Sequence, residues 1–518
     1  MLIILLSHFL NLFTTSDSTI YDLLIGSYTR EGNPGIEVYQ FNAVTGATKV
    51  EYTLKNPNAS YQAVNNNRSF FYSVNEDGPE KSMVSAYQRT AEGKYQLLNT
   101  ESTSGSGPCY VTFRESTKTV YVANYGSGSL SVFKTENGKL LPITQHIVYK
   151  GSGINKTRQQ APHAHQVIIS PDQQYVYVTD LGTDLIHQHK INTDGTLLET
   201  PTDIPVKPGS GARHLTFNKD GSFAYVISEM SGTVDVFSVS KDHQFKNIQR
   251  IIADTTRAES KGSGHIQLSP NGKWLLTSNR VTIDEVTIFS VQADGKLKKA
   301  GHQPVTKKPR MFSFDPTGKF VLVAGQEGNT VQVFSFDDQK GTMLDTKQDV
   351  RLSMPVCLSF IARDEPIDPE KQLKKLGISL FPPVAPIANY VKFVRVGNLI
   401  FLSGHGPDKP EGGQIFGKIG KDLSIEDGQQ AARLTGISLI STLKAAVGDL
   451  NNVKRIVKVS GFVNSADGFG QQPAVMNGFS NLMVDVFGEK GKHTRTSVGV
   501  NALPNNIAVE IEMIVEVY

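Results

Sequence analysis

The chain has 518 residues, of which 52 are Lys or Arg and 49 are Asp or Glu, so its formal net charge at pH 7 is only +3. So long a chain exceeds one hydrophobic core and predicts two or more domains. The balanced charge gives no reason to expect nucleic acid as a partner, or a membrane once the chain is processed. Its two cysteines, Cys109 and Cys357, belong to no CxxC or Cys/His cluster, so we expect neither a metal site nor a cofactor.

The first residues, "MLIILLSHFLNLFTTSDS", form a mostly apolar run followed by small and hydroxylated residues. The run is shorter than the roughly 20 residues that span a bilayer, and it suits the apolar part of a secretory signal. We therefore interpret residues 1–19 as a signal peptide or lead segment. No Lys or Arg precedes the run, and His8 and Asn11 interrupt it, so a mispredicted start or a disordered lead is the alternative. A signal would place the protein in the periplasm or outside the cell, and otherwise we expect it in the cytoplasm.

Residues 20–361 contain a repeated pattern. Two regular copies are "NKDGSFAYVISEMSGTVDVFSVS" (218–240) and "DPTGKFVLVAGQEGNTVQVFSF" (315–336). Each has a polar turn with glycine, a short apolar strand, a polar loop and an alternating strand. Four short strands in a period of roughly 50 residues predict a blade of a β-propeller. The centres of the first apolar strands number seven: Ile25, Tyr72, Tyr121, Tyr177, Tyr225, Leu275 and Leu322.

The strand before each apolar strand is expected to line the central channel. The first copy lacks such a strand, whereas "MPVCLSF" (354–360) is an inner strand with nothing after it. We therefore predict that the late strand completes the first blade and closes the ring, which hides the sheet edges. The predicted inner strands lie near Tyr61, Cys109, His165, Arg213, His265, Met311 and Cys357.

Several inner strands and the loops that follow the next strands carry strongly polar residues. Because they recur at corresponding positions of different blades, they should converge on one end of the channel. A lone buried His or Arg is often satisfied by backbone or water, but many together are costly unless they bind something. Arginine suits a carboxylate, a phosphate or an oxyanion, and His or Glu can activate water. The set comprises His163, His165, Asp180, Arg213, His214, Glu229, His265, Asn279, Arg280, Arg310 and Gln326.

The motifs "HQVIISPD", "GSGARHLTF", "SEMSGTVDVF" and "GQEGNTVQVF" resemble those of the bacterial lactonase family of seven-bladed propellers. That family includes 6-phosphogluconolactonases and carboxy-muconate lactonising enzymes. The resemblance implies catalytic roles for His165, Arg213, Glu229 and Arg280. We expect substrate-binding roles for His163, Asp180, His214, His265, Asn279 and Arg310.

The leading hypothesis for this segment is lactone hydrolysis. Arg213 and Arg280 would hold an anionic substrate and its oxyanion, and either His165 or Glu229 would be the general base for water. Two alternatives stay open. One is an isomerase that closes a dicarboxylate into a lactone, and the other is a propeller that binds a ligand or serves as a scaffold without catalysis.

Residues 362–389 are polar and then proline-rich, and we interpret them as a linker with a lead-in helix. In "DPEKQLKKLG", Asp368 is a helix cap, Pro369 the first helical residue and Gly377 the residue just past the end. Residues 390–518 then alternate strands and helices. We expect a hairpin at 390–404, helices at 424–450 and 472–488, and strands at 453–464, 495–501 and 509–517. This order predicts an α+β domain with one sheet and two helices on one face.

The last two predicted strands carry charges on one face of each. If they form a simple hairpin around Pro504 and Asn505, Glu510 pairs with Gly499, and Arg495 lies two pairs further on the same face, away from the helices. A small molecule between the two charged groups is the functional interpretation. A solvated sheet face or a subunit interface is the alternative.

Residues 372–518 are similar to the RidA (YjgF) family of trimeric imine deaminases, which has a chorismate-mutase-like fold. "APIANYVKFVRVGNLIFLSGHGP" and "HTRTSVGVNALPNNIAVEIEMIVEV" carry the resemblance. It implies that Arg495 binds the carboxylate of a 2-imino acid, that Glu510 positions water, and that Tyr390 and Gly404 contact the substrate. Ser497 stands where better-known members have a reactive cysteine. The resemblance also implies a homotrimer with sites between subunits; a non-catalytic trimerising sensor is the alternative.

Overall fold

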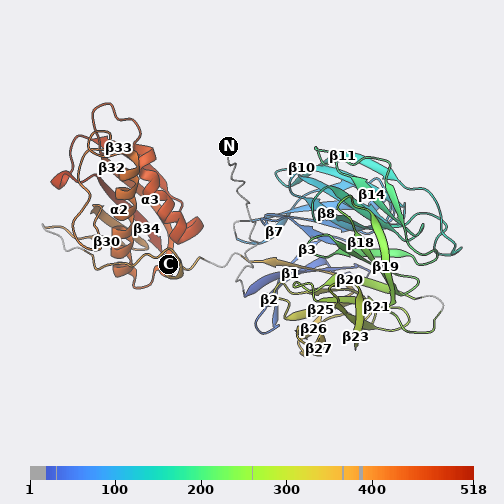
Figure 1. Ribbon diagram of the computed structural model, residues 1–518. Coiled ribbons are helices and arrows are strands. Elements are labelled where there is room, and N and C mark those ends of the chain that lie inside the picture. Colours follow the sequence, from blue (N-terminus) through green and yellow to red (C-terminus); the bar gives the residue numbers. More distant parts are fainter. Residues whose placement is uncertain (1–18, 31, 91, 259–260, 364–366, 384–388) are drawn as a thin grey trace. The chain divides into compact units, whose positions relative to one another are not determined.

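The computed structural model describes residues 19–518 except 31, 91, 259–260, 364–366 and 384–388 (Figure 1). The predicted signal segment therefore lies almost wholly outside the described residues. The chain divides into two compact units, Met1–Arg363 and Asp364–Tyr518. Among the described residues, no helix combines the length and apolar character needed to cross a membrane.

The first unit is a seven-bladed propeller, as the repeat predicts (Figure 1). In the first blade, β29 (Pro355–Ala362) pairs antiparallel with β1 (Ile20–Ser27), and β2 (Gly35–Asn42) and β3 (Thr48–Lys55) follow outward. The late strand therefore closes the ring, which confirms the prediction.

The other six blades each consist of four strands in chain order from the channel outward, and the last has an additional short strand, β28 (Val350–Arg351). Their strands are β4 (Gln62–Val64), β5 (Phe70–Asn75), β6 (Met83–Arg89), β7 (Tyr95–Ser102); β8 (Pro108–Arg114), β9 (Thr119–Asn124), β10 (Ser129–Glu136), β11 (Lys139–Val148); β12 (Ala164–Ile169), β13 (Tyr175–Asp180), β14 (Leu185–Lys190), β15 (Thr202–Pro205); β16 (Ala212–Phe217), β17 (Phe223–Ser228), β18 (Thr233–Val239), β19 (Phe245–Ile252); β20 (Ser263–Leu268), β21 (Trp274–Asn279), β22 (Glu285–Val291), β23 (Leu297–Pro304); and β24 (Pro309–Phe314), β25 (Phe320–Gly325), β26 (Thr330–Asp337), β27 (Thr342–Asp345).

Buried tyrosines at the same position of the second strand link neighbouring blades. The hydroxyl groups of Tyr72, Tyr121 and Tyr225 donate to glycine carbonyls in the next blade, at 3.2, 2.7 and 3.0 Å. Their apolar rings fill the space between sheets while the hydroxyl finds a partner, which is how tyrosine is best buried. These contacts recur at three of the junctions between blades and tie the neighbouring sheets together.

The second unit is a five-stranded sheet in the order β30-β31-β34-β32-β33, with helices packed on one face. The predicted lead-in helix is α1 (Pro369–Lys375), which Asp368 caps through the backbone N–H groups of Glu370 and Lys371. Its Leu373 is buried in the core of this unit, so the helix belongs to the domain. The remaining elements are β30 (Phe393–Val396), β31 (Leu399–His405), α2 (Ile425–Val447), β32 (Val453–Asn464), α3 (Gln472–Phe487), β33 (Thr494–Val500) and β34 (Val509–Val517).

The predicted hairpin of the last two strands is wrong. Strand β33 pairs parallel with β32, and β32 pairs antiparallel with β34, so the long apolar β32 separates the two. Glu510 is therefore opposite Phe462 rather than Gly499. The turn residues around Pro504 and Asn505 suggested a hairpin. However, helix α3 connects β32 to β33 as a crossover, and a helical crossover joins strands that lie parallel.

Candidate active site

The propeller's inner strands share a backbone irregularity at the end of the channel. The pairing register slips by one residue at the second position of β8, β12, β16 and β24. The residue skipped at these β-bulges is Cys109, His165, Arg213 or Arg310. A bulge leaves one residue out of the ladder and re-aims its side chain, and bulges are frequent beside functional sites. The repeated bulge thus explains why polar side chains on these strands leave the packed blades.

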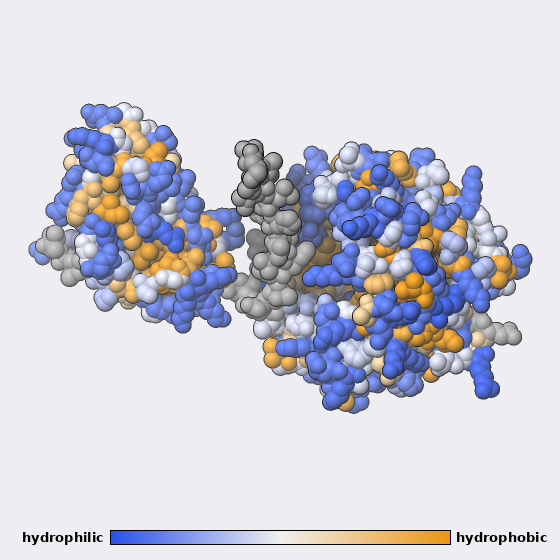
Figure 2. Space-filling view, viewed as in Figure 1, coloured by the Kyte–Doolittle hydropathy of each residue, from blue (hydrophilic) through white to orange (hydrophobic). Residues whose placement is uncertain are grey.

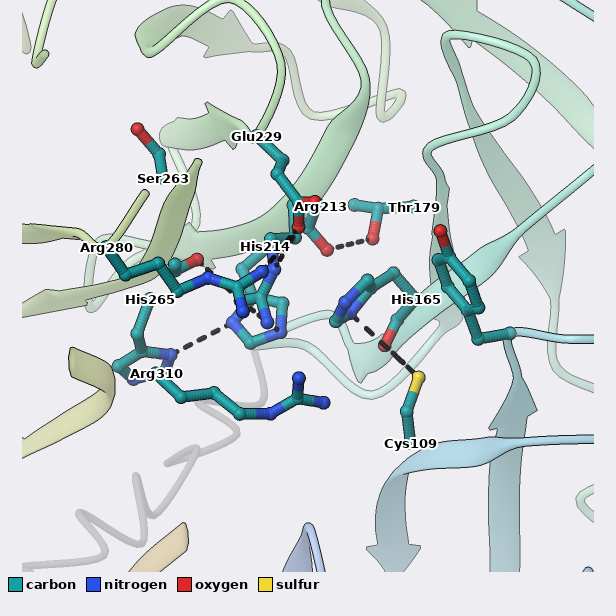
Figure 3. Close-up of polar contacts among 12 residues, drawn as sticks. Cys109, His165, Thr179, Arg213, His214, Glu229, Ser263, His265, Arg280 and Arg310 are labelled. Atoms are coloured by element: carbon teal, nitrogen blue, oxygen red, sulfur yellow. Dashed lines mark hydrogen bonds and ion pairs between the residues drawn. The ribbon is translucent and has the colours of Figure 1, made fainter. Parts of the chain in front are cut away.

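Three arginines converge on one carboxylate, that of Glu229. Figure 3 shows two of them, Arg213 and Arg280, beside it. Its Oε2 accepts from Nε of Arg213 and from Nη2 of Arg280, both at 2.9 Å. Its Oε1 accepts from Nη2 of Arg158 at 2.8 Å. Glu229 follows β17 and Arg280 follows β21, at corresponding positions of adjacent blades.

A second ion pair lies in the same region of the propeller. Arg310 donates to Glu76 Oε2 at 3.0 Å, and its guanidinium lies 5.3 Å from the ring centre of Tyr28. With this pair included, four arginines face two carboxylates. The site therefore carries two surplus positive charges, which favours an anionic ligand.

His165 lies beside this cluster. Burial, followed by the charge of Arg213, holds the pKa of His165 well below its usual range. The ring is therefore neutral at pH 7 and offers a lone pair. The buried thiol of Cys109 donates to the backbone carbonyl of His165 at 3.2 Å, which fixes the backbone there.

Two further histidines extend the cluster inward. Nδ1 of His214 and Nδ1 of His265 lie 2.9 Å apart, so one donates to the other. Burial, with the charge of Arg213, lowers the pKa of His265 to about 3, and burial with Arg213 also keeps the pKa of His214 far below normal. Both rings are neutral at physiological pH and add no charge to the site.

A narrow cavity lies among these side chains, with room for about one water molecule. Two buried polar atoms beside this cluster have no hydrogen-bond partner within the described part of the chain: Nε of Arg280 and Oγ of Ser60. The cavity is lined by Ser60, Tyr61, Cys109, His165, Arg213, His214, Arg310, Met311 and Val356.

The sequence leaves His165 and Glu229 as alternatives for the general base, and their surroundings distinguish them. Burial alone would raise the pKa of Glu229, but Arg280 and Arg213 outweigh burial and hold it far below its usual range. Both of its oxygens already accept hydrogen bonds from arginines. A carboxylate so stabilised is a weak proton acceptor, and it positions the guanidinium groups instead.

The structure thus brings together His165, Arg213, His214, Glu229, His265, Arg280 and Arg310. His163 lies at the edge of this group, where its ring stacks on Tyr125 at 4.5 Å and its Nδ1 donates to the Tyr125 carbonyl. Its position therefore leaves its Nε2 edge for a ligand.

Asp180 and Asn279 do not join the cluster, and their predicted substrate-binding roles do not fit the structure. Each is the last residue of its strand, and neither side chain is hydrogen-bonded to an arginine of the cluster. Asp180 accepts from His187 and from the backbone N–H groups of His163 and Gly182. Asn279 donates to Ala253 and Glu285 and accepts from Ser263. Both are fully buried and satisfied within the protein.

Sequence reasoning missed Glu76, Tyr125 and Arg158. Glu76 follows β5 and Tyr125 follows β9, as Glu229 follows β17, so a stricter alignment of the repeats would have found them. Arg158 lies in the connection from β11 to β12, outside the repeat, and no periodic signal could have identified it.

In the C-terminal unit, Arg495 and Glu510 lie on opposite faces of the sheet, so the predicted shared face is wrong. Arg495 is opposite the buried Val459, on the face that the helices cover. It donates to Asn477 Oδ1, Ser480 Oγ and the Pro473 carbonyl of α3 at 3.1, 3.0 and 3.3 Å. The alternation of residues in β33 suggested that its Thr and Val side chains face the helices and that Arg495 faces away from them. In the structure the Thr and Val side chains face solvent instead.

Glu510 and Gly404 do lie together, on the face without helices. A Cβ atom at Gly404 would be 2.1 Å from Oε1 of Glu510, so only glycine leaves room for this carboxylate. Burial, then the charge of Glu512, raises the pKa of Glu510. Tyr390 is largely exposed, in the segment before β30. Ser497 lies on the helix-covered face with Arg495, and its hydroxyl is buried without a partner among the described residues.

No group of three or more His, Cys, Asp or Glu side chains within the described residues could hold a metal ion. The ionisable side chains described at the propeller site include four arginines, three neutral histidines and the two carboxylates of Glu229 and Glu76.

Comparison with known proteins matches both units. Residues 22–360 match the family described as lactonase, 7-bladed β-propeller. Residues 370–517 match the YjgF/chorismate mutase-like family, whose description adds a conjectural endoribonuclease activity.

Individual relatives cover the propeller. A 6-phosphogluconolactonase of Formosa agariphila is 33% identical over 339 residues, which are 63% of this chain and 96% of that protein. A crystal structure of a Bacteroides fragilis protein is 41% identical, with a TM-score of 0.64, and the match covers 67% of this chain and 99% of that one. The periplasmic gluconolactonase PpgL of Pseudomonas aeruginosa is 30% identical, with a TM-score of 0.62, and the match covers 66% and 99%.

Proposed function

Because this chain belongs to the lactonase family of seven-bladed β-propellers and carries a YjgF/chorismate mutase-like domain after it, we propose that the propeller hydrolyses the ring ester of a small anionic lactone. The relatives named 6-phosphogluconolactonase and gluconolactonase support a sugar lactone as the substrate class. The reaction would take place at the cluster around Glu229.

The observation that carries this proposal is the surplus of positive charge. Three guanidinium groups share the one carboxylate of Glu229, and Nε of Arg280 is a buried donor without a partner among the described residues. Burying charge without full compensation costs several kcal/mol per ion. An anionic substrate would supply the missing negative charge and an acceptor for Arg280.

The proposed mechanism uses His165 as general base. The neutral imidazole accepts a proton from water as the water oxygen attacks the lactone carbonyl carbon. Arg280 and Arg213 stabilise the negative charge that develops on the carbonyl oxygen. The tetrahedral intermediate then collapses, the ring C–O bond breaks, and the leaving alkoxide takes the proton from the imidazolium. The product is a hydroxy acid, whose carboxylate remains beside the arginines.

A bound anion would also tune the base. In the free protein, the positive charge of Arg213 adds to burial in lowering the pKa of His165. A substrate anion offsets that charge, so the pKa of His165 rises when substrate is bound, which makes the imidazole a stronger base. Substrate binding and activation of the base are thus coupled.

The test is a panel of lactones followed against their spontaneous hydrolysis. The panel includes neutral glucono-lactone, its 6-phosphate and a lactone with a free carboxylate. Wild-type protein should accelerate ring opening of at least one anionic member, and His165→Asn should lose about 10²–10⁴-fold in kcat. His146→Asn, on the exposed outer strand β11, is the matched control and should behave as wild type. Wild-type rates equal to the spontaneous rates would refute the proposal.

The N-terminal segment bears on the substrate. If residues 1–19 direct export, the enzyme would meet unphosphorylated lactones, and the carboxylate arm of the panel becomes the expected one. If the protein is cytoplasmic instead, the phosphorylated lactone is the expected substrate.

For the C-terminal domain we propose a homotrimer in which a second subunit completes any site for 2-imino acids. Within one chain, Arg495 and Glu510 lie on opposite faces and cannot act on one substrate. The face of Glu510 lacks helices and exposes Val394, Val396, Phe401 and Val498, at 40–61% of their surface. Hydrophobic side chains also reach the visible surface of this unit in Figure 2. Exposed apolar patches of this kind mark interaction surfaces.

Light scattering of the whole protein tests this assembly. We expect a trimer for wild type and dissociation for Phe401→Asp, because a charge on the apolar face disfavours its burial. A monomeric wild type, or imine hydrolysis that survives dissociation, would contradict the proposal.

A further inference from the structure

Arg158 is the one arginine of the cluster that does not come from the blade repeat. It lies in the connection of residues 149–163, between β11 and β12. The corresponding connections before β8 and β24 span only residues 103–107 and 305–308. The propeller therefore needs no such long segment to join two blades, and loops of this kind carry function more often than structure.

The segment around Arg158 is held firmly in place. Asn155 Oδ1 accepts from the backbone N–H groups of Thr157 and Arg158 at 3.0 and 3.1 Å. The fully buried Gln159 accepts from the N–H of Asn155 at 3.1 Å and donates to the carbonyl of Leu181 at 2.9 Å. Hydrogen bonds of Asn155 therefore order the loop before Arg158, and Gln159, directly after it, anchors the loop to the next blade.

The three arginines differ in how firmly they are held. Arg213 and Arg280 share Oε2 of Glu229 and are 1% and 10% exposed, whereas Arg158 alone occupies Oε1 and is 39% exposed. Arg158 also donates to the hydroxyl of Tyr125 at 3.4 Å, a long hydrogen bond. Partial exposure to solvent screens an ion pair, so the bond of Arg158 to Glu229 is weaker than it would be if both groups were buried. Of the three, Arg158 is the one whose guanidinium can reach an incoming anion at small cost.

Its place in the site differs as well. Arg158 is 39% exposed beside Glu229, whereas Arg213 is 1% exposed. A group bound by Arg158 would therefore lie nearer to solvent than a group bound by Arg213.

We propose that Arg158 is the specificity-determining residue of the site: it binds an anionic substituent, phosphate or carboxylate, that the lactone carries away from its ester. This inference rests on the proposed lactonase function. Guanidinium binds both anions through paired N–H donors. Arg158 would exchange its bond to Glu229 for the substrate's anion, and Glu229 would keep Arg213 and Arg280 in position.

The experiment compares kcat/KM of wild type, Arg158→Met and Arg158→Lys on phosphorylated, carboxylated and neutral lactones. We expect Arg158→Met to lower the ratio of kcat/KM for the preferred charged lactone to that for neutral lactone by about 10–100-fold, the range of one charge-assisted hydrogen bond. Arg158→Lys should recover part of the ratio. The lactone with the larger drop identifies the anion. Arg351→Met, on the exposed strand β28, is the control.

Equal losses on charged and neutral lactones would overturn the inference, since they would show that Arg158 only supports Glu229. If wild type opens no lactone, the proposed function fails instead. Titration calorimetry with inorganic phosphate then tests Arg158 separately: weaker binding by Arg158→Met than by wild type supports the anion site, and equal binding or none overturns it.

Discussion

Replacing Arg280 by Met should lower lactonase activity without unfolding the propeller. Arg280 donates to Oε2 of Glu229, and its buried Nε has no partner among the described residues. Met removes both donors but keeps the length and the apolar part of the side chain. If Arg280 stabilises the oxyanion, losing it costs about 10²–10³-fold in kcat.

The effect on stability follows from distances. At an effective dielectric constant of 20, the attraction between Arg280 and Glu229 at 2.9 Å is about 6 kcal/mol. Arg213 lies 2.9 Å from the same oxygen, so the two arginine nitrogens are at most about 5.8 Å apart and repel each other by about 3 kcal/mol. Burying the guanidinium costs several kcal/mol more. These contributions nearly cancel, so the free energy of unfolding should change by less than about 1.5 kcal/mol.

The assay pairs initial rates of lactone opening with thermal unfolding of the same preparations. A large loss of activity with nearly unchanged stability is expected of a residue kept for function. The reasoning would be refuted by the opposite pattern, a marked fall in unfolding temperature with activity per folded molecule intact. Arg351→Met serves again as the surface control.

Three further outcomes are expected. Burial and the charge of Arg213 hold the pKa of His165 low, so log kcat/KM for a lactone should stay level from pH 8 down to pH 6 and fall only below pH 6. A fall centred near pH 6.5 would contradict the lowered pKa of His165. Burial opposes charge on His187, but hydrogen bonds to Asp180 and Asp203 outweigh it and raise its pKa, so its contribution to stability is complete below about pH 6.5 and is lost as pH rises through the raised value. The difference in unfolding temperature between wild type and His187→Gln should therefore shrink between pH 6 and pH 9, and a constant difference would show that His187 titrates normally. Arg495→Met should lower the free energy of unfolding of the C-terminal domain by about 1–3 kcal/mol in denaturant unfolding, since it removes three hydrogen bonds to α3. Arg395→Met, on the exposed strand β30, is its control. Equal stability of the two variants would show that these hydrogen bonds contribute nothing.

The sequence could predict the propeller because its information is periodic. Each blade repeats the same apolar strand and turn, and the unpaired strand near Cys357 indicated ring closure. The same periodicity located His165, Arg213, Glu229 and Arg280, since corresponding positions of a ring face one channel. It could not locate Arg158, which has no counterpart in other blades.

Asp180 and Asn279 show that the repeat pattern locates functional positions only to within about one residue. Asn279 directly precedes Arg280, which joins the cluster, and in a strand a shift of one residue moves a side chain to the other face. The face of the sheet on which Arg495 lies could not be predicted from the sequence either. Which face of β33 is covered depends on its partner strand, and the partner is set by the crossover through α3 rather than by the sequence of β33 itself.

The chemistry of Glu229 was also beyond sequence. A glutamate in a channel could be a base or a counter-ion, and only the three surrounding guanidinium groups decide between them. After all ion pairs are counted, the site still has more arginines than carboxylates. The proposal of an anionic substrate depends on this surplus of positive charge.

The most direct measurement is a crystal structure of the protein with 6-phosphogluconate, the hydroxy acid product of the phosphorylated lactone. The account predicts the product carboxylate within hydrogen-bonding distance of Arg280 and Arg213, beside His165, with the phosphate at Arg158. Product bound elsewhere, or Arg158 still bound to Glu229 at millimolar product, would contradict it.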